Sequence, residues 1–249
     1  MKNILAKAQK PTLKRFASSE TLLALDFDGT LASSSKEPRS AQLRAATRRV
    51  LAAVAARYPT VVISGRTRAD VLARLEGVPL RAVIGNHGLE PSPEAQSYRA
   101  IVKGWLPTLR AQIESEQGVE IENKLYSLTI HYRRSKAKRR ALTAIRRAVA
   151  ALGDGARTIE CKQAVNVLPA GAPNKTDALL AQQDSLATKT AIYLGDDIAD
   201  DPVLGSGDPS KLLSVHVGRA ANTNAGYYLP KQTDVDRFLA SLLELRPGD

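Results

Sequence analysis

Residues 22–31 read LLALDFDGTL, and this stretch decides how the rest of the chain is interpreted. Its apolar half has the length and composition of a strand that is buried on both faces. Asp26 and Asp28 follow where that strand ends, and Gly29 with Thr30 then turns the chain. Residues i and i+2 of an extended segment point to the same side, so the two carboxylates are expected to face one site.

Two carboxylates at one edge of a sheet have two interpretations. They form a hard oxygen site of the kind that binds Mg²⁺, and they can divide covalent phosphoryl transfer between a nucleophile and a proton donor. Asp-Gly pairs are also common in surface turns, where they cap the following segment and carry no chemistry. The segment alone leaves both interpretations open.

Along the rest of the chain, outside the middle segment, short apolar runs alternate with amphipathic stretches. The runs that predict further buried strands are 60–63, 81–84, 190–194 and 213–217. The stretches that predict helices are 40–57, 68–75, 175–183 and 235–245. This alternation predicts an α/β fold, a Rossmann-like, doubly wound parallel sheet with helices on both faces. Ligands of such sheets bind beyond the carboxyl ends of the strands.

The middle of the chain has a different pattern. It contains a helix, an alternating strand at 126–133 (YSLTIHYR), a basic helix and a strand pair between 157 and 168. This grouping predicts a smaller α+β insertion, and proline and glycine mark both of its edges. We therefore expect a core domain formed by residues 1–96 and 170–249, with an inserted α+β cap domain at 97–169.

Composition excludes several classes of protein. The chain is 43% hydrophobic and 24% charged, which is typical of a folded globule. Cys161 is the single cysteine, which excludes an intrachain disulfide and suits a reducing compartment. The first twenty residues lack the apolar block of a secretory signal, and no apolar run approaches the ~20 residues that span a bilayer. We expect a cytoplasmic monomer without a membrane partner, and a short amphipathic N-terminal helix packed on the core.

The formal net charge of +11 has three interpretations: a nucleic-acid binder, a surface that attracts small anions, or a solvated helix face. Much of the excess lies in 133–147, RRSKAKRRALTAIRR, which has almost no aromatic residues for base stacking. Apolar residues recur there at helical spacing, which favours a solvated basic face and no nucleic-acid partner. These residues are Ala141, Leu142, Ile145, Ala148 and Val149.

Three further features favour chemistry at the sheet edge. The run TVVISGR (60–66) delivers Ser64 to a strand end, where its hydroxyl can hold a phosphoryl oxygen. Lys175 opens a helix and can reach a phosphate as a point charge, although a single lysine is more often a plain surface residue. Residues 193–201, YLGDDIADD, end another strand in clustered acids that repel one another unless a cation or solvent intervenes. In this order, the features together predict phosphoryl transfer.

The strings LDFDGTLA, SGR, the later lysine and GDD-x-x-D resemble the four motifs of the haloacid-dehalogenase superfamily of phosphatases. Within it, the chain is similar to the trehalose-6-phosphate phosphatase family. The strings that carry this likeness are IGNHGLE at 84–90, ENKLYSLTIHYR at 122–133, and the spacing from the lysine to 194–201. The resemblance covers almost the whole length, and it implies a cap that closes over the core and a sugar phosphate as substrate, with trehalose 6-phosphate first.

The resemblance also implies a mechanism. Asp26 attacks phosphorus and forms an aspartyl-phosphate; Asp28 protonates the departing sugar oxygen and then activates water. Mg²⁺ would be bound by the Asp26 carboxylate, the Asp28 backbone carbonyl and Asp196.

The phosphoryl oxygens would be held and neutralised by Ser64 and Lys175. Asp200, and less directly Asp197, would support the metal or the lysine. The same loops would supply further substrate contacts at Thr30, Gly65, Arg66 and Asn86.

Sugar recognition is assigned by the resemblance to the cap. Glu122, Lys124 and Arg133 match its recognition positions, and a substrate without the matching hydroxyls would leave such polar groups unpaired. Taken without the family, Glu122 and Lys124 equally fit an exposed ion pair on an edge strand. His131 fits a packed strand residue as well as a substrate contact.

Two departures from the family pattern affect the expected substrate. The last motif reads GDDIADD, with Ala199 and Asp201 where the family usually has threonine and glutamate. Asn166, in AVNVLP, stands where the family commonly has a glutamate that helps to hold the sugar. Other sugar phosphates, such as sucrose 6-phosphate or a phosphorylated glycosyl-glycerate, are therefore alternatives. A basic polyanion-binding protein is the alternative from another class.

Overall fold

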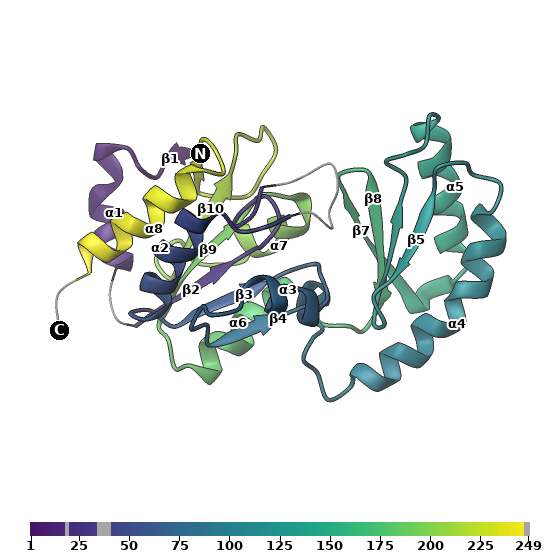
Figure 1. Ribbon diagram of the computed structural model, residues 1–249, viewed down its shortest axis with the longest axis horizontal. Coiled ribbons are helices and arrows are strands. Elements are labelled where there is room, and N and C mark those ends of the chain that lie inside the picture. Colours follow the sequence, from purple (N-terminus) through teal and green to yellow (C-terminus); the bar gives the residue numbers. More distant parts are fainter. Residues whose placement is uncertain (18–19, 34–40, 247–249) are drawn as a thin grey trace. The chain divides into compact units, whose positions relative to one another are not determined.

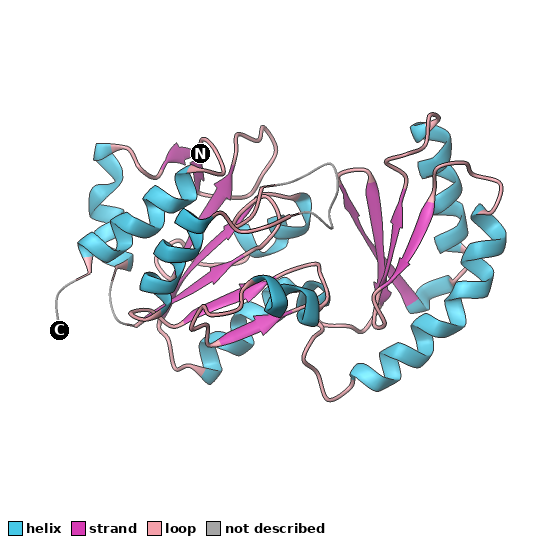
Figure 2. Cartoon of the chain, viewed as in Figure 1, coloured by secondary structure: helices cyan, strands magenta, loops and turns pink. Residues whose placement is uncertain are grey.

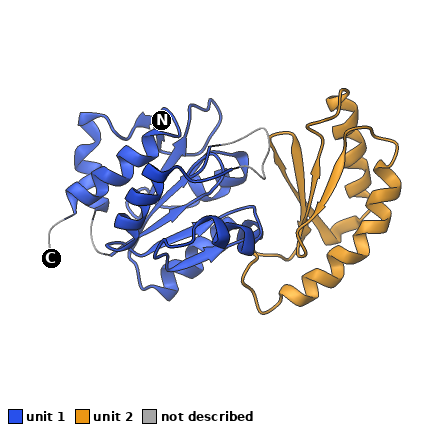
Figure 3. Cartoon of the chain, in the orientation of Figure 1, with its two compact units in different colours: residues 1–88, 174–249 blue, residues 89–173 orange. Residues whose placement is uncertain are grey.

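The computed structural model describes residues 1–17, 20–33 and 41–246. The chain divides into two compact units (Figure 3). The first is formed by residues 1–88 and 174–249, and the second by residues 89–173. The second unit is longer at both ends than the 97–169 insertion expected from the sequence.

The first unit is built on a parallel sheet of seven strands in the order β1-β11-β10-β9-β2-β3-β4 (Figure 1). The chain runs outward from β2 to β4 on one side, and the later strands add on the other, so the order reverses beside β2. The strands are β1 Lys2–Asn3, β2 Thr21–Leu25, β3 Thr60–Ile63, β4 Ala82–Ile84, β9 Thr190–Gly195, β10 Leu212–Val217 and β11 Tyr227–Leu229.

Strand β2 shows why helices cover both faces. Leu23 and Leu25 pack into one apolar cluster, whereas Leu22 and Ala24 pack into another on the opposite face. The first cluster includes residues of α1 (Lys10–Phe16), α2 (Ala45–Ala55), α3 (Arg68–Arg74) and α8 (Asp234–Leu245). The second includes residues of α6 (Lys175–Ser185) and α7 (Asp201–Leu204). The doubly wound sheet predicted from the sequence is thus confirmed.

The second unit is an antiparallel sheet covered on one face by two helices (Figure 2). Its strand order is β5-β6-β8-β7, and α4 (Ala95–Ile113) and α5 (Lys138–Ala150) contribute the buried side chains of the covered face. The strands are β5 Glu120–Asn123, β6 Leu128–His131, β7 Ala156–Cys161 and β8 Ala164–Pro169. Short 3-10 helices complete the chain: η1 Lys7–Gln9, η3 Asn86–Gly88, η4 Gly153–Gly155 and η5 Ile198–Asp200. The predicted α+β composition of the insertion is confirmed.

Several predicted boundaries were wrong. Helix α2 begins at Ala45, later than the predicted start at Ser40. Ser40 itself lies outside the described residues. The helix does not reach back to Ala41 because the backbone of Arg44 is extended, with φ of −65° and ψ of 146°. The basic run is only partly helical, since α5 begins at Lys138. The N-terminal amphipathic helix is confirmed as α1, with Leu13 and Phe16 buried. None of the helices in the described ranges combines the length and the apolar composition that a bilayer crossing needs.

Candidate functional site

Asp26 is the first residue after β2, at the carboxyl edge of the parallel sheet. Its backbone N–H donates to the Leu194 carbonyl of β9 over 2.9 Å, which ties it to the neighbouring strand. Gly29 takes a φ of 77°, and its N–H donates to the Ala32 carbonyl over 2.7 Å, so DFDGT forms a tight turn. The buried Asp26 carboxyl group is therefore fixed by backbone bonds on both sides.

Lys175 is the first residue of α6, and the helix start is built to hold it there. The Asn174 side chain accepts from the backbone N–H of Asp177, whose carboxylate accepts from the Asn174 N–H in return. The Lys175 ammonium donates to Asp26 Oδ1 over 2.7 Å and to Asp200 Oδ1 over 2.6 Å. All three charged groups are buried.

Asp200 is the acceptor that links this lysine to the acidic loop. Besides Lys175, its carboxylate accepts from the Tyr193 hydroxyl over 2.7 Å and from the backbone N–H groups of Asp196 and Asp197. Four donors on one carboxylate hold the lysine and the loop in one geometry. Tyr193 was not predicted from the sequence, because a tyrosine in an apolar strand has the pattern of an ordinary core residue.

Oxygens of Asp26, Asp196 and Asp200 lie within 4.8 Å of one another. Burial raises the pKa of Asp196 to about 9, and the charges of Asp26, Asp200 and Asp197 add to the effect. Burial also raises the pKa of Asp26 to about 8, against the opposing charge of Lys175. For Lys175, burial acts to lower the pKa, but Asp200 and Asp26 outweigh it and raise the pKa well above its usual value.

Three carboxylates facing one ammonium leave an excess of negative charge in a buried site, which fits a hard divalent cation. Two glycines make room for this cluster. A side chain on Gly29 would collide with the Asp196 carboxylate, and one on Gly195 would collide with Asp200. The residues present therefore suit a cation at this edge of the sheet.

Ser64 lies at the end of β3, fully buried, and its hydroxyl accepts from the Arg66 N–H over 3.2 Å. A left-handed turn fixes this loop from the other side. Asn86 and His87 have φ values of 48° and 60°, and their N–H groups donate to the carbonyls of Arg66 and Ser64. Gly65 lies against the His87 ring and has no space for a larger side chain. His87 was missed, since a sequence does not show a left-handed backbone at a non-glycine residue.

Asp28 is not part of the group of carboxylates formed by Asp26, Asp196 and Asp200. Its carboxylate accepts a two-pronged hydrogen bond from Arg66, over 2.6 Å and 2.7 Å, and its side chain is 41% exposed. Thr30 lies in the same turn, where its carbonyl accepts from Gln232. The Thr30 hydroxyl is buried without a hydrogen-bond partner among the described residues.

Two of the four cap residues predicted from the sequence, Glu122 and Asn166, lie on the face of the antiparallel sheet opposite its helices. Strand register places Glu122, Thr129 and Asn166 in one row across β5, β6 and β8. Glu122 contacts His131 over 2.8 Å, while Asn166 accepts from Thr129 over 2.6 Å and donates to Cys161 Sγ over 3.1 Å.

The other two predicted residues lie outside this row. Lys124 follows β5, and Arg133 follows β6. The Lys124 N–H donates to the Ser127 carbonyl over 3.0 Å, and the Arg133 carbonyl accepts from Lys138 over 3.1 Å.

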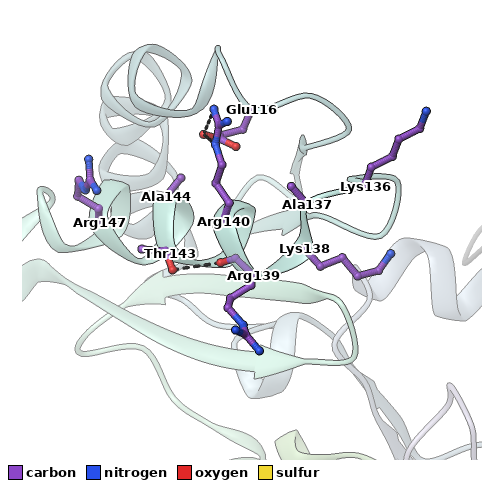
Figure 4. Close-up of a pocket in the computed structure, with 9 residues that line it drawn as sticks. All are labelled: Glu116, Lys136, Ala137, Lys138, Arg139, Arg140, Thr143, Ala144 and Arg147. Carbon is purple, nitrogen blue, oxygen red and sulfur yellow. Dashed lines mark hydrogen bonds and ion pairs between the residues drawn. The ribbon is translucent and has the colours of Figure 1, made fainter.

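The basic helix borders an open groove of about 810 Å³ (Figure 4). Arg140 turns toward Glu116 and pairs with it over 3.2 Å, whereas Lys136 and Lys138 extend to the opposite side of the view from Arg147. The basic side chains do not converge on a common point, and none of the predicted site residues lines the groove. This arrangement favours the solvated face expected from the sequence.

Comparison with known proteins agrees with the fold and with the family resemblance. The trehalose-phosphatase family model matches residues 24–232. The trehalose-phosphate phosphatase of Mycobacterium tuberculosis (strain ATCC 25618 / H37Rv) is 31% identical over 190 residues, which cover 71% of this chain and 48% of that protein. The chain thus spans about half the length of the curated relatives it matches first.

Among solved structures, the C-terminal domain of a C. albicans trehalose-6-phosphate phosphatase superposes with a TM-score of 0.78 at 22% identity, covering 95% of this chain and 97% of that one. A Bacteroides thetaiotaomicron phosphatase of the haloalkanoate (HAD) superfamily has a TM-score of 0.56 at 18% identity, covering 90% and 94%. At these identities the likeness concerns the fold, which is that of the HAD phosphatases. The family-model match and the mycobacterial relative decide the family: the chain belongs to the trehalose-phosphatase family.

Proposed function

We propose that this protein is a Mg²⁺-dependent phosphatase that hydrolyses a sugar phosphate monoester, with trehalose 6-phosphate as the leading substrate. The observation that carries the proposal is the buried contact of Lys175 with Asp26 and Asp200, beside Asp196. A binding module has no need to bury two carboxylates on one ammonium, with a third beside them at a sheet edge, because burying these charges costs free energy.

In the first half-reaction, an Asp26 oxygen forms a bond to phosphorus while the bond from phosphorus to the sugar oxygen breaks. Asp28 gives its proton to the departing sugar oxygen, which leaves as a hydroxyl group. In the second, Asp28 takes a proton from water as the water oxygen bonds to phosphorus, and the bond from phosphorus to Asp26 breaks. Asp26 returns as a carboxylate, and inorganic phosphate leaves.

Positioning and charge stabilisation supply most of the catalysis in phosphoryl transfer. Ser64 and Lys175 would hold the phosphoryl oxygens, with further contacts from the loops that carry Thr30, Gly65, Arg66 and Asn86. Mg²⁺, when bound by the Asp26 carboxylate, the Asp28 carbonyl and Asp196, would neutralise negative charge on the phosphoryl group. Asp200 keeps Lys175 and the acidic loop in place, and Asp197 caps that loop.

Sugar recognition is assigned to the face of the cap sheet opposite its helices and to the turns that follow β5 and β6. Glu122, Lys124, Arg133 and Asn166 are the proposed contacts. Asn166 is neutral where the family commonly has a glutamate, so sucrose 6-phosphate and phosphorylated glycosyl-glycerates stay candidate substrates. A cytoplasmic location and a monomeric state stay predictions.

The test is phosphate release from a panel of sugar phosphates, with and without Mg²⁺. Wild type should hydrolyse at least one ester, and Asp26→Asn should abolish release. Asp201→Asn is a matched control in the same acidic motif, because the Asp201 carboxylate accepts from Thr223 and not from Lys175. Absence of release from every ester would contradict the proposal. Binding to an anionic polymer that falls steeply with salt and survives Asp26→Asn would favour the polyanion-binding alternative.

A further inference from the structure

Among the described residues, it is the side chain of Arg66, from the loop after β3, that holds the carboxylate of Asp28. Arg66 Nε donates to one oxygen of Asp28 over 2.6 Å, and Nη2 donates to the other over 2.7 Å. This two-pronged arrangement fixes the plane of the carboxylate as well as its position. The direction in which Asp28 faces is therefore set by Arg66.

The guanidinium group of Arg66 is also held by a second carboxylate, that of Asp70. Nη1 donates to Asp70 Oδ2 over 2.7 Å, and Asp70 also pairs with Arg74 four residues later on α3. The guanidinium group lies over the ring of Phe27, 5.5 Å from its centroid. Arg66 thus joins Asp28 to Asp70 in an alternating chain of charges that ends at Arg74.

This contact bears on the proton transfer assigned to Asp28. A carboxyl group that gives its proton to a leaving oxygen cannot keep both of its oxygens as acceptors of the same guanidinium. One of the two Arg66 hydrogen bonds has to open when the ester is bound. The other can remain, because Arg66 is still anchored by Asp70, and Asp28 is exposed enough for a ligand to reach it.

We propose that Arg66 is the positioning residue for Asp28: it keeps one carboxyl oxygen of Asp28 while the other is presented to the leaving oxygen of the ester. This inference rests on the proposed phosphatase function. It goes beyond that function by assigning Arg66 to the leaving-group proton transfer, in addition to any contact with the phosphoryl group. The two roles predict different selectivity among substrates.

The distinction depends on the leaving group. A sugar hydroxyl leaves as a strongly basic oxygen and needs the proton from Asp28, whereas the nitrophenolate of p-nitrophenyl phosphate leaves without one. Loss of a phosphate contact slows both esters alike. Loss of the positioning of Asp28 lowers kcat/KM, which reports the steps up to departure of the leaving group, for the sugar ester alone.

The experiment compares kcat/KM for the best sugar phosphate and for p-nitrophenyl phosphate in wild type, Arg66→Lys and Arg74→Lys. Lysine keeps the positive charge but cannot form the two-pronged hydrogen bond to Asp28. Arg74 is a matched control, because its side chain, like that of Arg66, is 11% exposed and pairs with Asp70, yet only Arg66 contacts Asp28. We expect Arg66→Lys to lower kcat/KM for the sugar ester about tenfold or more beyond its effect on the aryl ester. Arg74→Lys should leave the ratio unchanged.

A double-mutant cycle with Asp28→Asn completes the test. Once Asp28 cannot transfer a proton, adding Arg66→Lys should cost little more on the sugar ester. An unchanged ratio of the two esters in Arg66→Lys, or additive losses in the cycle, would overturn the role of Arg66 while leaving the phosphatase function intact. A wild-type protein that hydrolysed neither ester would overturn both.

Discussion

Lys175 donates a hydrogen bond to Asp26 over 2.7 Å, and the two residues lie 149 positions apart in the chain. Each belongs to a different element of the core: Asp26 follows β2, an inner strand of the sheet, and Lys175 begins α6. The contact is buried and shared with Asp200, so each of the three charges depends on the others.

Removal of the ammonium group should therefore affect both stability and activity. Lys175→Met leaves buried carboxylates without their partner, and we expect a loss of about 3 kcal/mol in the free energy of unfolding, measured by urea denaturation of the metal-free protein. Phosphate release should fall at least about a hundredfold, because the phosphoryl oxygens lose a charge partner. Adding Asp200→Asn should restore part of the stability and none of the activity. Unchanged stability in the single variant would contradict this interpretation.

Binding of Mg²⁺ should strengthen as pH rises. The pKa values of Asp26 and Asp196 are raised to about 8 and about 9 in the folded protein, so the folded state holds protons that the unfolded chain has lost above about pH 4. The stability that these groups contribute is present at low pH and is lost as pH rises through their folded pKa values.

The cation takes the place of those protons, so the Mg²⁺-induced rise in melting temperature should be larger at about pH 8.5 than at about pH 6. Differential scanning fluorimetry with and without Mg²⁺ measures it. Asp196→Asn should remove most of the rise at both pH values. An equal rise at both pH values in wild type would argue against a cation among these carboxylates.

Gly29 provides a test of the space around Asp196. Gly29 and Gly77 both have positive φ values, 77° and 80°, but of the two only Gly29 faces a site residue. Alanine at either position should cost about 1 kcal/mol of stability, because an L-residue is strained there. Only Gly29→Ala should also lower phosphate release and weaken Mg²⁺ binding, since its methyl group would displace the Asp196 carboxylate. Equal kinetic effects of the two substitutions would show that strain alone accounts for them.

Asn166 tests the glutamate that the family pattern leads us to expect at this position of the cap. Its amide oxygen accepts from Thr129 and its amide nitrogen donates to Cys161, so both ends of the amide are used in a buried position. Asn166→Glu replaces that donor with an acceptor, and we expect a loss of about 1–3 kcal/mol in stability. The same substitution should improve the relative rate on trehalose 6-phosphate if that sugar is held as in relatives with glutamate. A stable variant with an unaltered substrate ranking would separate Asn166 from sugar recognition.

The sequence predicted the central part of the fold well, because its signals are local. The apolar run before Asp26 and those before Ser64 and Asp196 are buried strands of one parallel sheet, as their length and branched residues indicated. Strands β1 and β11 were missed, since they span two and three residues and carry no periodic pattern. Their pairing depends on tertiary contacts.

The contacts around the candidate site were less accessible to sequence reasoning. The hydrogen bond from Tyr193 to Asp200 and the fork between Arg66 and Asp28 depend on side-chain directions that residue types do not encode. The left-handed turn at Asn86 and His87 depends on how β4 meets the loop after β3. Motifs identified the chemical groups, and the fold decided which of them touch.

The most direct test of the account is to trap the phosphorylated intermediate. Asp28→Asn should still accept the phosphoryl group from an activated ester but should activate water poorly, so the intermediate should accumulate. The protein is mixed with labelled ester and Mg²⁺, quenched in acid and digested, and the peptides are analysed by mass spectrometry. The account predicts a phosphoryl group on Asp26, and none in the protein that also carries Asp26→Asn. Phosphate release by wild type with label on another residue, or with no labelled peptide in Asp28→Asn, would contradict it.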